Sequence, residues 1–116
     1  MEIKNQRALA TLLARLRKGN LQQSGLTEDL IPPSKEIAYR VAHLVERELG
    51  WEVKGWKIAA TNTEMQRALR TDTPIYGRVY SQFIKQSPLT VNFDELSSPI
   101  PEAEYQVFLG KDLPPR

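Results

Sequence analysis

The most informative absences in this chain concern cysteine and long apolar runs. The sequence has no cysteine and a single histidine, His43, so disulfide frameworks, thiol nucleophiles and cysteine-based metal sites are excluded. No apolar run approaches the roughly 20 residues that a membrane-spanning helix needs. The polar start, with Glu2 and Asn5, lacks the pattern of a secretory signal. We therefore expect a cytoplasmic protein that is not embedded in a membrane.

The chain also has little excess of positive charge over negative charge. The chain has 16 lysines and arginines against 14 acidic residues, a net charge of +2, which gives no sign of the broad basic surface of nucleic-acid-binding proteins. One basic cluster lies in the last turn of the first predicted helix and consists of Arg15, Arg17 and Lys18. Positive charge is favourable there because it lies at the negative end of the helix dipole. Because no aromatic residue is interleaved with this cluster, we expect a solvated helix end and no nucleic-acid or membrane partner.

Two amphipathic helices are predicted in the first 50 residues. The chain has 116 residues, of which 41% are hydrophobic, and these values are typical of one small globular domain. A helix over residues 2–18 is predicted because leucines recur at helical spacing: Leu9, Leu12, Leu13 and Leu16. A second helix should begin after Ser34 as N-cap and end at Gly50. Its apolar face is formed by Ile37, Val41, Leu44 and Val45.

The remainder of the chain, residues 51–116, is predicted to be mainly β structure with one short helix. Val53–Ala60 alternates in the manner of a strand and places Lys57 on a face of small residues. A short helix should follow, with Thr61 in the capping position. Further strands are predicted around Gly77 and at residues 89–93. The fold class expected for this single domain is α+β, with helices first and a small β-rich part after them.

The last predicted strand, residues 99–110, carries two carboxylates on one face. Glu102 and Glu104 are two residues apart, so a pleated strand points both side chains in the same direction. Two neighbouring carboxylates repel each other unless they lie in water or surround a cation. Mg²⁺ and Mn²⁺ prefer such oxygen ligands. From spacing alone, a solvated strand edge and a metal site both remain open.

Three motifs give the chain a resemblance to a known family. The first is Pro-Glu-Ala-Glu at residues 101–104, followed by an apolar strand and Gly-Lys-Asp-Leu-Pro at 110–114. The second is Gly-Trp-Lys-Ile-Ala-Ala-Thr at 55–61, and the third is Thr-Pro-Ile-Tyr-Gly-Arg-Val-Tyr at 73–80. In this order and spacing they resemble the 2-keto-4-pentenoate hydratase family of the fumarylacetoacetate hydrolase superfamily. The resemblance covers residues 35–116 and, loosely, the first helix.

The resemblance implies an enzyme that hydrates, or decarboxylates, an unsaturated 2-oxo acid in the breakdown of aromatic compounds. It assigns Glu102 and Glu104 to a divalent metal, Mg²⁺ or Mn²⁺. It makes Lys57 a catalytic residue that binds the substrate carboxylate or transfers a proton, with its pKa lowered if the amine is desolvated. It assigns substrate contacts to Thr61 and Gly77. At Ser81 and Gln82 the chain departs from the family, which often has acidic residues at these two positions.

The resemblance also bears on what this chain lacks. Family members continue beyond this point into a larger β-rich domain that carries a third acidic metal ligand and most of the substrate pocket. The chain therefore corresponds to the N-terminal part of such an enzyme, and we expect a homo-oligomer or pairing with a full-length relative. The alternative to an enzyme is a non-catalytic remnant or an interaction module that pairs with such a relative through exposed strands.

Overall fold

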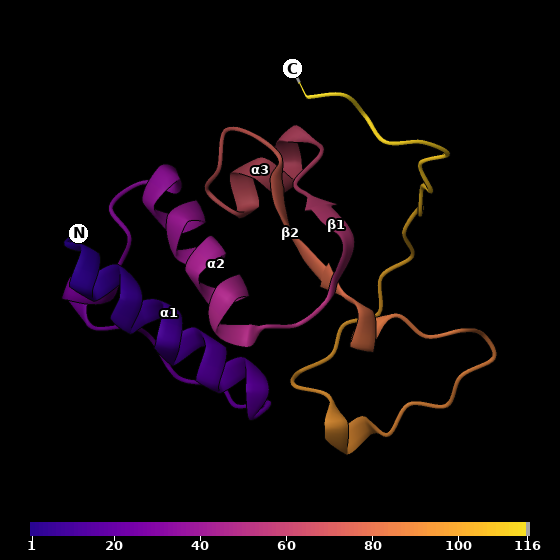
Figure 1. The fold of residues 1–116 in the computed structure, drawn as a ribbon, viewed down its shortest axis with the longest axis horizontal. Coiled ribbons are helices and arrows are strands. Elements are labelled where there is room, and N and C mark those ends of the chain that lie inside the picture. Colours follow the sequence, from indigo (N-terminus) through magenta and orange to yellow (C-terminus); the bar gives the residue numbers. More distant parts are fainter. Residues whose placement is uncertain (116) are drawn as a thin grey trace.

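The computed structural model describes residues 1–115. Helices occupy the first half of this range, and a small antiparallel sheet follows them (Figure 1). The elements in chain order are α1 (Ile3–Lys18), the 3₁₀ turn η1 (Glu28–Leu30), α2 (Lys35–Leu49), β1 (Val53–Ala59), α3 (Thr63–Ala68), β2 (Ile75–Tyr80) and the 3₁₀ turns η2 (Ser81–Phe83) and η3 (Phe93–Glu95). This confirms the general α+β class. None of the described helices is long and apolar enough to cross a membrane.

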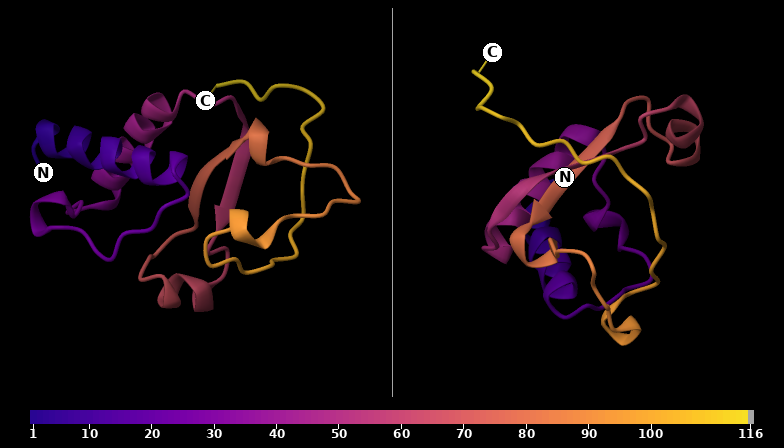
Figure 2. Two further views of the ribbon diagram at one scale, coloured as in Figure 1. Left: turned by 90° about the horizontal axis from the view of Figure 1, so that it is seen from below. Right: turned by 90° about the vertical axis from the view of Figure 1, so that its right-hand side faces the viewer.

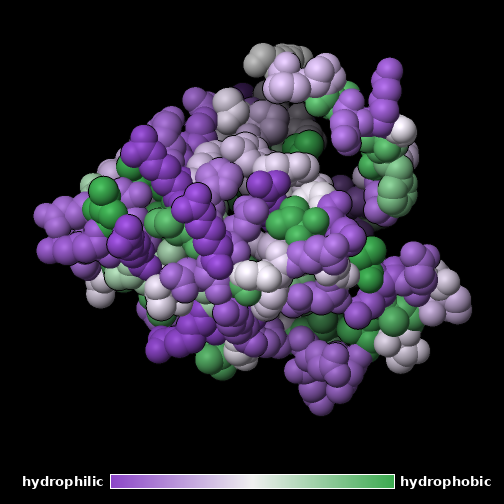
Figure 3. Space-filling model, viewed as in Figure 1, coloured by the Kyte–Doolittle hydropathy of each residue, from purple (hydrophilic) through white to green (hydrophobic). Residues whose placement is uncertain are grey.

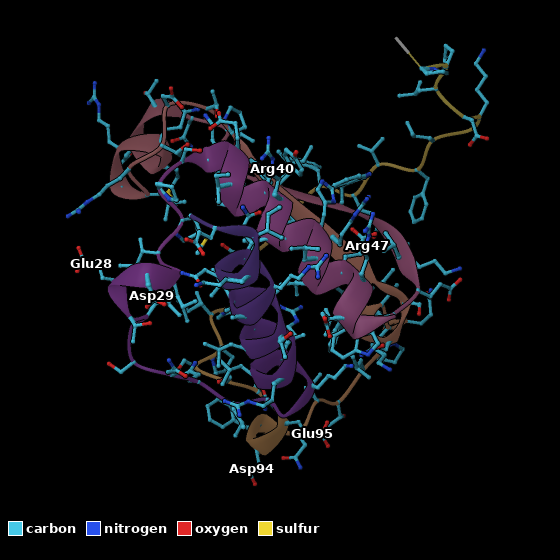
Figure 4. All side chains as sticks on the ribbon, turned by 60° about the vertical axis from the view of Figure 1, so that its left-hand side comes forward. Glu28, Asp29, Arg40, Arg47, Asp94 and Glu95 are labelled. Carbon is cyan, nitrogen blue, oxygen red and sulfur yellow. The ribbon has the colours of Figure 1, made fainter. Side chains whose placement is uncertain are left out.

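Helices α1 and α2 pack side by side and run in the same direction (Figure 1). The connection between them returns the chain to the start of α1, where Asn5 Nδ2 donates to the carbonyl of Asp29 at 3.2 Å. At the other end, Lys18 Nζ donates to the carbonyl of Glu48 at 2.8 Å. Arg40 and Arg47 lie two turns apart on the solvent-exposed surface of α2 (Figure 4). The apolar side chains of α1 and α2 are therefore buried where the two helices face each other, and the outer surface of α2 is exposed to solvent.

Both predicted helices are confirmed, but only Leu9 of the four leucines expected on the apolar face of α1 is fully buried. The buried side chains of this helix are Gln6, Leu9, Ala10 and Ala14, whereas Leu13 is exposed. The small side chains of Ala10 and Ala14 permit close approach of a neighbouring element, which turns the buried stripe away from Leu13. Leu9 and Ala10 pack with Val41 of α2.

Helix α2 has the predicted boundaries. The Ser34 hydroxyl accepts from the amide of Ile37 at 3.4 Å, and Gly50 adopts the left-handed conformation with φ of 63°. The next segment continues directly into the sheet. Tyr80, at the end of β2, packs with Ala14 and Leu49, so a second apolar cluster ties the strands to the helices.

The sheet has two strands. β1 pairs antiparallel with β2, with Lys57 opposite Gly77 and Trp56 opposite Arg78. In the sequence, α3 lies between β1 and β2. Its N-cap is Asn62, whose side-chain oxygen accepts from the amide of Met65 at 2.9 Å. The predicted cap at Thr61 is therefore wrong by one residue, because the amide oxygen of Asn62 reaches the same free helix amides.

The predicted strands at residues 89–93 and 99–110 are wrong. Within the described part of the chain, residues 84–115 contain η3 and no other helix or strand. This trailing segment passes beside the sheet without joining it (Figures 1 and 2). Its turn η3 lies near the end of α1, where Asn20 Nδ2 donates to the carbonyl of Glu95 at 2.9 Å (Figure 4). An alternating sequence favours a strand only where a neighbour completes its hydrogen bonds, and the trailing segment has none here.

Candidate functional site

Lys57, Glu102 and Glu104 come together on one side of the sheet. The ammonium nitrogen of Lys57 lies 3.2 Å from Oε2 of Glu102 and also contacts Oε1 of Glu104. The three side chains are 43%, 64% and 52% exposed. Two carboxylates therefore converge on one cation at an open, solvated position. That cation is an ammonium supplied by β1.

The alternation of β1 explains how Lys57 reaches this position. Along Val53–Ala59 the residues on the Lys57 face are half-buried and those on the opposite face are exposed. Its neighbours on that face are Gly55 and Ala59, and its cross-strand partner is Gly77. A methyl group added to Gly55 or Gly77 would meet no atom within 4 Å among the described residues. The side chains around Lys57 on this face are therefore small, and this leaves space for the trailing segment and for a ligand.

The two carboxylates raise the pKa of Lys57. The main cause is the hydrogen bond to Glu104, with a further contribution from Glu102, while partial desolvation acts in the opposite direction. This differs from the sequence-based expectation of a lowered pKa, because the amine is solvated and paired and is not buried in an apolar cleft. A paired Lys57 is thus an ammonium at neutral pH. It can hold an anion or donate a proton, but it cannot act as a base in this state.

A surface cavity of about 500 Å³ adjoins this site and follows β2. Its lining includes Lys57 and Gly77 of the sheet and two residues outside the sheet, Arg17 and Phe83. The guanidinium of Arg17 lies 5.3 Å from the ring centroid of Phe83. Thr61 is exposed and is not among the residues that line this cavity. The structure therefore places Gly77 beside Lys57 and leaves Thr61 apart from both.

The donor set of this site fits a loosely held divalent ion. Glu102 and Glu104 offer carboxylate oxygens to a common point, and Mg²⁺ is often bound by one or two carboxylates together with water and substrate oxygens. Residues 1–115 contain no group of three or more acidic or histidine side chains suited to a metal. Two protein ligands are therefore available, and Lys57 competes with a metal ion for both of them.

A second cluster, on the opposite face of the sheet, was not anticipated from the sequence. The guanidinium carbon of Arg78 lies 3.6 Å from the ring centroid of Trp56, and Arg78 Nε donates to Glu46 Oε2 at 2.9 Å. Tyr76 stacks on Tyr39 with ring centroids 4.3 Å apart. The exposed position of Trp56 follows from strand alternation, but the contacts of Arg78 and Tyr76 with α2 depend on helix docking. This cluster joins α2 to the sheet behind Lys57.

Comparison with known proteins adds no family to this picture. No protein-family model matches the chain, and no solved structure matches it. A functional assignment therefore depends on the residues of the site and on the three sequence motifs.

Proposed function

We propose that this chain takes part in the metal-dependent hydration, or decarboxylation, of an unsaturated 2-oxo acid such as 2-keto-4-pentenoate. The observation that carries the proposal is the convergence of Lys57, Glu102 and Glu104 at one open position. These three residues belong to two of the motifs that resemble the hydratase family, and the cross-strand partner of Lys57, Gly77, belongs to the third. Their proximity supports the resemblance because sequence spacing alone does not require it.

In this mechanism Glu102 and Glu104 are the residues that would hold a Mg²⁺ or Mn²⁺ ion. The ion, when bound, supplies positive charge that polarises the 2-oxo group of the substrate. The ammonium of Lys57, released from the two carboxylates, binds the substrate carboxylate or donates a proton to the substrate carbon skeleton. The open face at Gly77 admits the flat, unsaturated body of the acid. The hydroxyl of Thr61, at the end of β1, is proposed as a further substrate contact.

The direct test is metal binding by the chain, measured by calorimetry with Mn²⁺. We expect one ion per chain, and we expect E102Q and E104Q each to weaken binding at least tenfold. E95Q is the matched control, because Glu95 is an exposed acid of η3 outside the site. Hydration of 2-keto-4-pentenoate in the presence of Mn²⁺ should disappear in E102Q. Turnover by E102Q equal to that of the unaltered chain would exclude the assignment.

A second function, an interaction module that pairs with a full-length relative, is supported by a different observation. Seven large apolar side chains of the trailing segment are at least two-thirds exposed, with Tyr105 at 102% and Phe108 at 83%; the others are Phe93, Ile100, Val107, Leu109 and Leu113. This role does not need a metal. Absence of Mn²⁺ binding would therefore favour the interaction module over the enzyme. A cytoplasmic location remains a prediction under both functions.

A further inference from the structure

The outer edge of β1 has no hydrogen-bonding partner. β1 pairs with β2 on one side. On its other side, the backbone of Val53–Ala59 makes no hydrogen bond to any other described residue. An unpaired edge of this kind offers a row of amide and carbonyl groups to any extended chain that reaches it. The two-stranded sheet is therefore open to extension at β1.

The trailing segment contains a strand-like stretch whose backbone also lacks hydrogen-bonding partners. Residues 105–109 (Tyr-Gln-Val-Phe-Leu) alternate and consist mainly of residues with high β propensity. Their backbone makes no hydrogen bond within residues 1–115, and their apolar side chains face solvent. Figure 3 shows hydrophobic residues, in green, at several places on the visible surface of the molecule. Such a stretch gains both hydrogen bonds and apolar burial when it joins a sheet.

One face of the sheet has an apolar part next to the open edge. Trp56 and Ile58 are 52% and 56% exposed, and with Pro74, Ile75 and Tyr76 they line a shallow, almost wholly apolar cavity. A strand added beside β1 can direct Tyr105, Val107 and Leu109 to this face, because these three residues share one side of the strand. Their side chains would then cover the exposed surface of Trp56 and Ile58.

We propose that residues 105–109 of one copy of this chain add as a strand to the β1 edge of a second copy. The occupant is a second copy because each chain carries both halves of the contact, the open edge and the unpaired segment, so that the pair is reciprocal. Within one chain Lys57 of β1 already pairs with Glu102 and Glu104, which lead into residues 105–109. In the reciprocal pair, the same residues of the other copy can take the place of these partners. The contact does not depend on the proposed enzymatic function.

The test is sedimentation equilibrium of the full chain and two proline variants. In V107P, proline removes a backbone donor from the added strand. V91P is the matched control, because Val91 is also an exposed valine of the trailing segment outside regular structure. We expect the unaltered chain and V91P to form dimers with similar dissociation constants. The dissociation constant of V107P should be at least about tenfold higher.

Hydrogen exchange identifies the surfaces involved. In the dimer, the amides of residues 53–59 and of residues 105–109 should both become protected as protein concentration rises. A chain that is monomeric at all concentrations overturns the proposal, and so does pairing of the two stretches within one monomer. A dimer that V107P leaves unchanged places the interface elsewhere and also overturns it.

Discussion

The ammonium nitrogen of Lys57 lies 3.2 Å from Oε2 of Glu102, although 45 residues separate the two side chains in the sequence. This contact joins the middle of β1 to the trailing segment, which has no regular structure at that point. It also places an ammonium where the sequence resemblance puts a metal ion. The ion pair and the metal site are thus alternative states of the same two carboxylates.

This competition predicts that removing the lysine tightens metal binding. In K57M the two carboxylates lose the ammonium that they share, so we expect the Mn²⁺ dissociation constant to fall severalfold. The effect should be modest because all three side chains are solvated. K54M is the control, since Lys54 lies on the same strand but pairs with Glu52. Calorimetry that finds weaker Mn²⁺ binding in K57M would show that the lysine assists the site and does not compete for it.

The pKa of Lys57 should be raised above the ordinary value of about 10.4. Glu104 is the main cause and Glu102 adds to it. The sign follows from linkage: the ion pair stabilises the folded state fully below the unfolded pKa and is lost as pH rises through the folded value. Titration of the lysine side chain by NMR measures this. The Lys57 pKa should fall in E104Q, and a value at or below the ordinary one in the unaltered chain would contradict the contact.

The parts of this structure that were predicted correctly depend on local signals. The Ser34 cap and Gly50 stop of α2 are set by groups within one turn of the helix ends, and β1 follows from its own alternation. The failures are long-range. Residues 105–109 alternate as a strand does, yet no partner strand reaches them within the described chain.

In the candidate site, too, the local features could be predicted from the sequence and the long-range contacts could not. Alternation places Lys57 beside small residues and gives Glu102 and Glu104 a common direction, but it cannot show that the cation between the carboxylates is Lys57. The raised pKa of Lys57 follows from that contact, so it could not be predicted from the sequence either. The contact of Arg78 with Glu46 depends on how α2 docks on the sheet, and its contact with Trp56 depends on the register of β2 against β1. The periodicity of a single strand specifies neither of them.

Gly77 and Gly55 permit a test of the proposed pocket with a built-in control. Neither glycine has positive φ, and neither has an atom within 4 Å of an added methyl group. Alanine should therefore stabilise the fold by roughly 0.5 kcal/mol at either position, since glycine is unfavourable inside a strand. Gly77 lines the cavity and Gly55 does not. We expect G77A to raise the KM for 2-keto-4-pentenoate severalfold, whereas an equal rise in G55A would remove Gly77 from the site.

Leu9 should be the most sensitive position of the helical core. It is 1% exposed and packs with Ala10 and Val41, so L9A should lower the free energy of unfolding by about 3 kcal/mol through lost burial and a cavity. Leu13, one turn along α1, is 37% exposed, and L13A should cost less than about 1 kcal/mol. Urea unfolding measures both variants. Equal losses would mean that the leucine stripe predicted from the sequence, and not the alanine stripe of the structure, faces α2.

Arg78 makes two separable contacts, one within the sheet with its cross-strand partner Trp56 and one with Glu46 of α2. Its guanidinium carbon lies 3.6 Å from the Trp56 ring centroid and its Nε lies 2.9 Å from Glu46 Oε2. Double-mutant cycles of R78M with W56L and with E46Q should each give a coupling energy of about 1 kcal/mol in urea unfolding, because the Arg78 and Glu46 side chains are three-quarters buried.

The variant R78K distinguishes the two contacts, because lysine keeps the charge but loses the planar group that stacks on the indole. It should retain most of the coupling to Glu46 and lose most of the coupling to Trp56. The exposed pair Lys4–Glu2, whose side chains are 77% and 71% exposed, is the reference and should couple by less than about 0.5 kcal/mol. If R78K keeps both couplings, the charge of residue 78 accounts for both contacts and the planar stacking on Trp56 contributes nothing.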